Sequence, residues 1–324
     1  MFLRNKTTKS YEQTDISKDF ELIQRISQKY KLSSHSRKVT IVSKRRKTFN
    51  TIIYEINANE RLLIGKSYLF KSKELLANEF NALLKFQNTL FGRKFCLPKP
   101  VDYYPDLGIL VMSKIEGINV RELLQKPNKL PSFLDIKKII KICSECLSIF
   151  HKSSYLGLKI KNISGVSIAL SQSYIDFDPS NMILVSNKDE RLGIIDLPEQ
   201  VVIDPIHRDI GTFFFGLAKS RMFLPYLLKW NLKFLINLQN IFFTNYFCYI
   251  NLIPTTFDYK LARFFEYSYG KKVLKRYTRL HRLLEYSYFS PLINSYLFLI
   301  KKKFLLNFDI AKFQDLTKNM EAAS

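Results

Sequence analysis

The chain has 324 residues, 47% of them hydrophobic, with 51 Lys and Arg against 28 Asp and Glu and a net charge of +23. A chain of this length and composition can bury a full core, most simply in two lobes. The positive charge disfavours a polycationic substrate, because long-range repulsion would slow its encounter with the protein. It favours an anionic acceptor, an anionic membrane face or nucleic acid instead.

Residues 1–35 are polar and basic, and the helical spacing of apolar residues over 20–26 predicts an N-terminal arm or helix. The first residues lack the apolar stretch of a signal peptide, so we expect a cytoplasmic protein. Residues 43–50 (SKRRKTFN) form a basic stretch that contains no glycine. Arg45, Arg46 and Lys47 could supply charge to phosphates, but a solvated basic turn is the favoured interpretation.

Two predicted elements follow, and each carries one charged side chain. Residues 61–68 are predicted to form a strand with Lys66 near its end, and residues 75–86 an amphipathic helix carrying Glu79. Either charge alone is more typical of a solvated surface. Residues 108–117 then predict an apolar strand that runs into a short polar segment ending in glycine, which suits a hinge between two lobes.

Residues 133–151 show a long helical pattern that contains Cys143 and Cys146. A CxxC pair can bind zinc or perform redox chemistry, but no second ligand pair of suitable spacing follows it in the sequence. The two thiols are therefore expected on one buried helix face, and His151, at the end of the pattern, in a structural role.

The stretch 174–184 (YIDFDPSNMIL) and the following 193–196 (GIID) form the most informative part of the sequence. Two short strands are predicted on either side of residues 187–191, and such a hairpin would bring Asn181 and Asp196 together. Two hard oxygen ligands of this kind can share a magnesium ion that bridges phosphates, with Asp176 close by to orient an attacking hydroxyl. Taken alone, the pattern is equally compatible with a surface hairpin that has ordinary polar turn residues.

The C-terminal part is aromatic and basic. Residues 234–257 contain no charge, but several Asn and Gln and one Pro argue against a membrane span, so buried helices are expected. Residues 258–303 hold eleven Lys and Arg against three Asp and Glu. This pattern permits a helix lying on anionic lipid, while a packed helix with a solvated basic face is slightly favoured.

In this order, the strand lysine, helix glutamate, hinge, DxxxxN and IIDL resemble the aminoglycoside phosphotransferase and choline kinase branch of the protein-kinase-like fold. The resemblance covers about residues 40–220. It implies an α+β, two-lobed protein with a small antiparallel sheet plus helix as the N-lobe (36–113) and a mostly helical C-lobe (114–324). The catalytic loop (174–184) and the metal-binding segment (193–199) would lie in the C-lobe, with a nucleotide cleft between the lobes.

The resemblance also implies roles for individual residues and two cofactors, ATP and Mg²⁺. Asp176 matches the catalytic aspartate, and Asn181 and Asp196 match the metal ligands. Lys66 and Glu79 match the phosphate-binding pair.

Three further positions follow from the same comparison. Ser113 and Ile115, in the hinge, are expected to bind the nucleotide through its purine edge. Asp209 matches the structural aspartate that follows the metal site, and its alternative interpretation is a plain N-cap of the next helix.

The chain departs from this family at two places and from other kinases at two more. Tyr174 stands where the family usually has histidine, and residues 43–50, which the resemblance implies to be the phosphate-covering loop, contain no glycine. Only twelve residues separate Asp196 from Asp209, and this leaves no room for the long activation segment that binds a peptide substrate. No GxxxxGK[ST] motif is present, so a P-loop enzyme is also disfavoured.

We therefore expect an ATP- and magnesium-dependent kinase that phosphorylates a hydroxyl of a small molecule, in particular an anionic sugar or glycoconjugate, as lipopolysaccharide-core kinases do. Peripheral contact with the inner membrane face is compatible with the charge. The alternatives are a catalytically silent kinase-like scaffold and a basic nucleic-acid-binding protein, and the second leaves the ordered motifs unexplained. The sequence does not define the acceptor, the choice between ATP and GTP, or the oligomeric state.

Overall fold

The computed structural model describes residues 7–30, 39–48, 51–68, 73–125, 136–163, 166–185, 191–198, 200–222, 232–279 and 289–306. The chain forms two compact units. The first contains Met1–Gln87 and Leu97–Ile115, and the second contains Asn88–Cys96 and Glu116–Ser324. The segment Asn88–Cys96 thus belongs to the second unit, although it lies within the range 36–113 that was expected to form the N-lobe.

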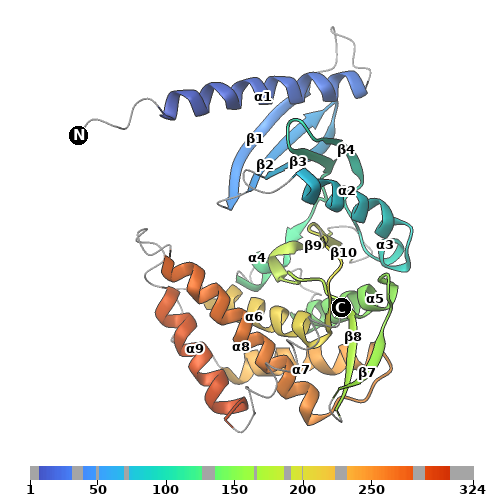
Figure 1. The fold of residues 1–324 in the computed structure, drawn as a ribbon, viewed down its shortest axis with the longest axis vertical. Coiled ribbons are helices and arrows are strands. Elements are labelled where there is room, and N and C mark those ends of the chain that lie inside the picture. Colours follow the sequence, from blue (N-terminus) through green and yellow to red (C-terminus); the bar gives the residue numbers. More distant parts are fainter. Residues whose placement is uncertain are drawn as a thin grey trace, which may run out of the picture. The chain divides into compact units, whose positions relative to one another are not determined.

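The first unit is built on a five-stranded antiparallel sheet with the strand order β1-β2-β3-β5-β4 (Figure 1). The strands are β1 (Val39–Thr48), β2 (Thr51–Ala58), β3 (Arg61–Tyr68), β4 (Pro100–Tyr104) and β5 (Ile109–Ser113). Strand β1 continues through Thr48, so most of the segment expected as a phosphate-covering loop is strand. The two residues between β2 and β3, Asn59 and Glu60, both have positive φ, as a tight two-residue hairpin requires.

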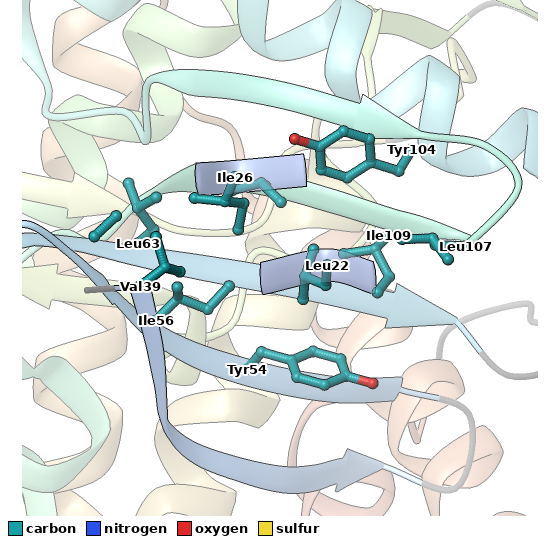
Figure 2. Close-up of a cluster of buried hydrophobic side chains, with 11 residues drawn as sticks. Leu22, Ile26, Val39, Tyr54, Ile56, Leu63, Tyr104, Leu107 and Ile109 are labelled. Atoms are coloured by element: carbon teal, nitrogen blue, oxygen red, sulfur yellow. The ribbon is translucent and has the colours of Figure 1, made fainter. Parts of the chain in front are cut away.

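Helix α1 (Thr7–Lys29) packs on one face of this sheet, and α2 (Lys73–Gln87) contacts β4 and β5. Leu22 and Ile26 of α1 are fully buried among strand side chains that include Ile56 and Leu63 (Figure 2). Successive side chains of a strand point to opposite faces. Lys66, three positions after Leu63, therefore lies on the face away from α1.

The second unit is mostly helical. Its helices are α3 (Leu90–Lys94), α4 (Val120–Gln125), α5 (Ile136–Ser153), α6 (His207–Met222), α7 (Leu232–Tyr249), α8 (Thr256–Arg279) and α9 (Phe289–Phe304). Helix α6 packs closely on α8 because Gly211 has no side chain, and a Cβ there would lie 2.5 Å from the Glu266 nitrogen. Cys143 and Cys146 are buried on α5, as the helical pattern predicted, and burial raises the pKa of both thiols.

Two small antiparallel sheets complete the second unit. One has the order β10-β9-β6, from Leu192–Ile194, Met182–Leu184 and Ile118–Asn119. The other has the order β11-β8-β7, from Ile203–Pro205, Val166–Gln172 and Lys159–Ile163. The predicted hairpin around the candidate site is therefore present as β9 and β10, and a 3-10 turn, η2 (Pro179–Asn181), leads into it.

The uncharged stretch 234–257 forms most of α7 and the turn before α8, as expected from its polar residues. In the part of the chain that the structure describes, no helix has the length and hydropathy needed to cross a membrane. The predicted α+β architecture, a small antiparallel sheet with helices followed by a mostly helical unit, is confirmed.

Candidate active site

The first unit holds a buried ion pair at the position that the sequence indicated. Lys66 of β3 and Glu79 of α2 are 4% and 1% exposed, and the Lys66 ammonium lies 2.7 Å from the Glu79 carboxylate. Tyr68 donates a hydrogen bond to the other carboxylate oxygen at 3.2 Å. Burying two charges is costly unless they pair with good geometry. Lys66 and Glu79 therefore form a specific buried pair, and the alternative that each is a solvated surface charge does not hold.

The hinge residues lie at the end of β5. The Ser113 backbone N–H donates to the Lys99 carbonyl at 2.9 Å, and the Ser113 hydroxyl accepts from the Lys99 N–H at 2.8 Å. Lys114 donates its N–H to the Leu62 carbonyl, and Ile115 is half-buried directly after it. These contacts fix the path of the segment, while the predicted contact of Ser113 and Ile115 with a purine stays a prediction.

The loop before β9 carries Asp176 and Asn181. The Asp178 side chain accepts from the Ser180 N–H and so begins the 3-10 turn that contains Asn181. The Asn181 amide nitrogen lies 3.0 Å from the Asp176 carbonyl oxygen and 3.1 Å from its Oδ2. Asn181 thus orients the Asp176 carboxyl group with its nitrogen, which leaves the amide oxygen to serve as an acceptor or ligand on its other side.

Asp196 is brought to the same end of the hairpin. Met182 of β9 is paired with Ile194 of β10, and the Ile195 N–H donates to the Asn181 carbonyl at 3.1 Å. Asp196 is the next residue.

Burial and two nearby acids, Asp178 and Asp196, affect the ionisation of Asp176. The Asp176 side chain reaches the surface, yet the surrounding protein reduces the hydration of its carboxylate and so raises its pKa. The negative charges of Asp178 and Asp196 raise that pKa further. Such a concentration of negative charge favours a cation at this position.

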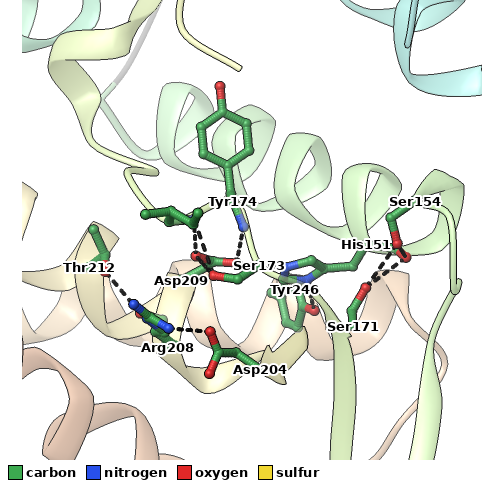
Figure 3. A network of polar contacts seen from close by, with 11 residues as sticks. His151, Ser154, Ser171, Ser173, Tyr174, Asp204, Arg208, Asp209, Thr212 and Tyr246 are labelled. Carbon is green, nitrogen blue, oxygen red and sulfur yellow. Dashed lines mark hydrogen bonds and ion pairs between the residues drawn. The ribbon is translucent and has the colours of Figure 1, made fainter. Parts of the chain in front are cut away.

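A second carboxylate, that of Asp209, holds the backbone of the loop that carries Asp176 (Figure 3). Its Oδ2 accepts from the Tyr174 N–H at 2.6 Å, and its Oδ1 accepts from the Ile175 N–H and the Ser173 hydroxyl, both at 2.9 Å. The His151 Nε2 lies 3.0 Å from Oδ2, while its Nδ1 lies 2.6 Å from the Tyr246 hydroxyl.

Asp209 is fully buried and is the third residue of α6, so its side chain does not cap that helix. The N-cap interpretation is therefore wrong, and the structural aspartate that the resemblance implied describes its contacts better. Ile175 has φ of 71°, which is uncommon for a β-branched residue. Backbone strain of this kind costs about 1–3 kcal/mol and persists only where the surroundings enforce it, as Asp209 does here.

Tyr174 links the catalytic loop to Asp196. The Tyr174 side chain is 2% exposed, and its hydroxyl donates to the backbone carbonyl of Asp196. Its ring packs edge-on against Phe150 and Phe177, with centroids 5.0 and 5.2 Å away. The Tyr174 hydroxyl thus anchors the segment that carries Asp196.

Sequence analysis did not assign a role in the site to Tyr269 of α8. Its hydroxyl lies 3.1 Å from Asp176 Oδ1. Tyr269 and Asp176 are 93 positions apart in the sequence. The sequence around Tyr269 is that of an ordinary aromatic and basic helix, so no local pattern marks this residue as part of the site. Only the tertiary packing of α8 against α6 brings it to the loop.

The side chains present fit a magnesium ion. An amide oxygen from Asn181 and a carboxylate from Asp196 are hard oxygen ligands, and Mg²⁺ is commonly bound through one or two protein groups together with waters and substrate phosphates. Among the described residues, no group of three or more His, Cys, Asp and Glu could hold a metal without such help. The chemistry of the donor set therefore suits a nucleotide-bound magnesium rather than a permanent all-protein site.

Comparison with solved structures identifies the fold. A choline/ethanolamine kinase family protein from Mesorhizobium loti aligns with a TM-score of 0.56 at 10% identity, over 88% of this chain and 95% of that one. The GDP and kanamycin complex of APH(2")-IIia aligns with a TM-score of 0.53 at 13% identity, over 87% and 98%. The macrolide 2'-phosphotransferase MphH from Brachybacterium faecium aligns with a TM-score of 0.50 at 8% identity, over 84% and 97%.

The chain thus has the protein-kinase-like fold of the choline kinases and antibiotic phosphotransferases, as its motifs predicted. No protein-family model matches the sequence, and no curated protein matches it. At identities of 8–13%, the structural likeness establishes the fold and leaves the substrate open.

Proposed function

We propose that this protein is an ATP- and magnesium-dependent phosphotransferase that transfers the γ-phosphoryl group to a hydroxyl of a sugar or glycoconjugate. The observation that carries the proposal is the catalytic loop, in which Asp209 fixes the backbone and Asn181 orients the Asp176 carboxylate. A loop fixed in this way supplies a positioned base next to hard oxygen ligands, within a fold shared with phosphotransferases.

Each residue has a defined part in the proposed reaction. Asp176 orients the acceptor hydroxyl and takes its proton, and Asn181 holds the carboxylate in place. Asn181 and Asp196 hold magnesium, which neutralises charge on the phosphates when it is bound. Lys66, kept in place by Glu79, contacts the phosphates. Ser113 and Ile115 contact the purine through their backbone.

The acceptor is proposed to be anionic. The net charge of +23 disfavours a polycation, and the described parts of α8 and α9 expose several lysines. These are Lys271, Lys272, Lys275, Lys301, Lys302 and Lys303. Phe298 of α9 is 63% exposed beside this charge, so a peripheral contact with an anionic membrane is part of the same proposal. The requirement for ATP favours the cytoplasm, at the inner membrane face if lipid is bound.

The first test is nucleotide binding. A ligand present at about 100 times its dissociation constant stabilises a protein by roughly 2.7 kcal/mol, so ATP with magnesium should raise the Tm of the wild type clearly. ATP with a chelator should raise it less, and Asp196→Ala should reduce the difference between the two conditions. A wild type that shows no shift with magnesium nucleotide would contradict the proposal and favour the silent scaffold.

The second test concerns the reaction. Wild type and Asp176→Ala are compared across a panel of phosphate acceptors that contains neutral sugars, sugar phosphates, acidic sugars and lipid-linked glycans. We expect transfer by the wild type to anionic members of the panel, and none by the variant. Equal product formation by the two proteins would show that Asp176 is not the catalytic aspartate. Transfer to neutral sugars alone would refute the anionic acceptor.

A further inference from the structure

The two carboxylate oxygens of Asp176 have different partners. Oδ2 accepts from the Asn181 amide nitrogen at 3.1 Å, and Oδ1 accepts from the Tyr269 hydroxyl at 3.1 Å. Asn181 belongs to the pair of proposed magnesium ligands, so Oδ2 is on the metal side of the carboxylate. Oδ1 is then the oxygen available to an acceptor hydroxyl, and Tyr269 places a hydroxyl of the protein on it.

Packing of α8 fixes the position of Tyr269. The Tyr269 ring meets Phe215 of α6 edge-on, with centroids 5.7 Å apart. The next residue is Gly270, where an added Cβ would lie 2.5 Å from Leu297 and 2.8 Å from Phe215. A larger residue there would displace these two side chains, including the Phe215 ring that Tyr269 contacts. The absence of a side chain at Gly270 therefore allows α8 to lie close enough to α6 and α9 for its tyrosine to reach the catalytic loop.

The contact between α6 and the loop is equally close. A Cβ at Gly216 would lie 2.6 Å from Pro179 and 3.0 Å from the Asp178 carboxylate. Phe215, which supports the Tyr269 ring, is the neighbouring residue of the same helix. Loop, α6 and α8 thus pack closely at this point, so the fold of the second unit places the Tyr269 ring, whose hydroxyl meets Asp176 at the exposed side of the loop.

We propose that Tyr269 is a positioning residue that occupies the acceptor side of Asp176 until an acceptor hydroxyl replaces it, and so suppresses transfer to water. This inference rests on the proposed function. In the suppressed reaction, a water oxygen bonds to the γ-phosphorus while the bond from that phosphorus to the β–γ bridging oxygen breaks. ADP leaves with the electron pair, and the water proton passes to Asp176. With Tyr269 donating to Oδ1, a water must displace the phenol before it can use that oxygen.

The test measures ATP hydrolysis by the full-length protein with magnesium and no acceptor. Tyr269→Phe keeps the ring and removes only the hydroxyl, so hydrolysis should rise about three- to tenfold, the range that one net hydrogen bond can provide. Tyr267→Phe is the matched control. Tyr267 is two residues away and so lies on a different side of α8, where Lys271 contacts its ring, and its hydrolysis rate should equal that of the wild type.

Two further measurements make the outcome decisive. Nucleotide affinity should be the same in wild type and both tyrosine variants, and Asp176→Asn should abolish hydrolysis in the Tyr269→Phe background. Hydrolysis by Tyr269→Phe at or below the wild-type rate would overturn the inference, and so would phosphate found on Tyr269 by mass spectrometry, since the phenol would then be an acceptor. If the wild type binds no magnesium nucleotide, the proposed function itself fails.

Discussion

The fixed backbone of the catalytic loop predicts a specific response to the substitution Asp209→Asn. Asparagine has nearly the shape of aspartate but replaces one acceptor oxygen by a donor NH₂ group. If this group takes the position of Oδ2, it faces the Tyr174 N–H, which lies 2.6 Å from that oxygen in the wild type. If it takes the position of Oδ1, it faces the Ile175 N–H at 2.9 Å. One backbone donor loses its acceptor in either orientation.

The magnitude follows from the four donors. Hydrogen bonds to a charged group contribute about 1.5–3 kcal/mol each, and those to a neutral group about 0.5–1.5 kcal/mol. His151 can adapt by changing its tautomer, since Nδ1 would then donate to the Tyr246 hydroxyl, and removing a buried charge offsets part of the weakening of the remaining bonds. Asp209→Asn should therefore reduce the stability of the loop by about 2–4 kcal/mol.

Hydrogen exchange of the Tyr174 and Ile175 amides measures this change locally. A loss of 2 kcal/mol accelerates exchange roughly 30-fold, because each 1.4 kcal/mol is a factor of ten. Asp204→Asn is the control, since Asp204 forms a partly exposed pair with Arg208 whose loss costs at most about 1 kcal/mol. A folded Asp209→Asn protein that exchanges these two amides at the wild-type rate would refute the reasoning that the carboxylate holds the loop.

Three further substitutions test the other parts of the site. Lys66→Met leaves the Glu79 carboxylate buried without its cation and should lower the free energy of unfolding, measured in urea, by about 3–5 kcal/mol. Replacing Glu79 by Leu as well should restore most of this stability. An unchanged urea midpoint for Lys66→Met would show that the pair is not buried. Tyr174→Phe removes the donor to the Asp196 carbonyl and should cost about 0.5–1.5 kcal/mol of stability in thermal denaturation. Magnesium ATP should also stabilise this variant less than the wild type. Equal stabilisation of the two proteins would show that this hydrogen bond does not affect magnesium binding at Asp196. Burial lowers the pKa of His207 below its ordinary 6.5. The stability that neutral His207 contributes is therefore full above about pH 6.5 and is lost as the pH falls toward the folded pKa. His207→Gln should show a flatter dependence of Tm on pH across this window, and a profile parallel to that of the wild type would contradict the lowered pKa of His207.

Much of the site could be predicted because its parts are local in sequence. The strand 61–68 and the hairpin after Asn181 are short apolar runs bounded by polar turns, and the structure contains them as β3 and as β9 with β10. The strand lysine, helix glutamate, hinge, DxxxxN and IIDL, in this order, carried the resemblance that predicted the fold, and each lies on an element that its own neighbours specify.

The remaining features depend on contacts between distant segments. Most of the segment expected as a phosphate-covering loop, residues 43–50, is strand, because pairing with β2 continues through Thr48. Asp209 was compatible with a helix cap because its position near the start of α6 gives that signal, and its true partners lie about 35 residues earlier. Tyr269 gave no signal, since its contact with the loop depends on the small residue that follows it.

Contacts within the second unit hold the loop that carries Asp176. Asp209 binds the backbone N–H groups of Tyr174 and Ile175, so it fixes the backbone of the loop directly. The strained φ of Ile175 costs about 1–3 kcal/mol, which two charge-assisted hydrogen bonds of the strength given above can offset. A tyrosine at 174 then needs only to fit the aromatic pocket and donate to the Asp196 carbonyl, and it does both. Asp209 thus fixes the backbone of the loop that carries Asp176, and Tyr174 ties this loop to the segment that carries Asp196, so both acids are held by contacts within the second unit.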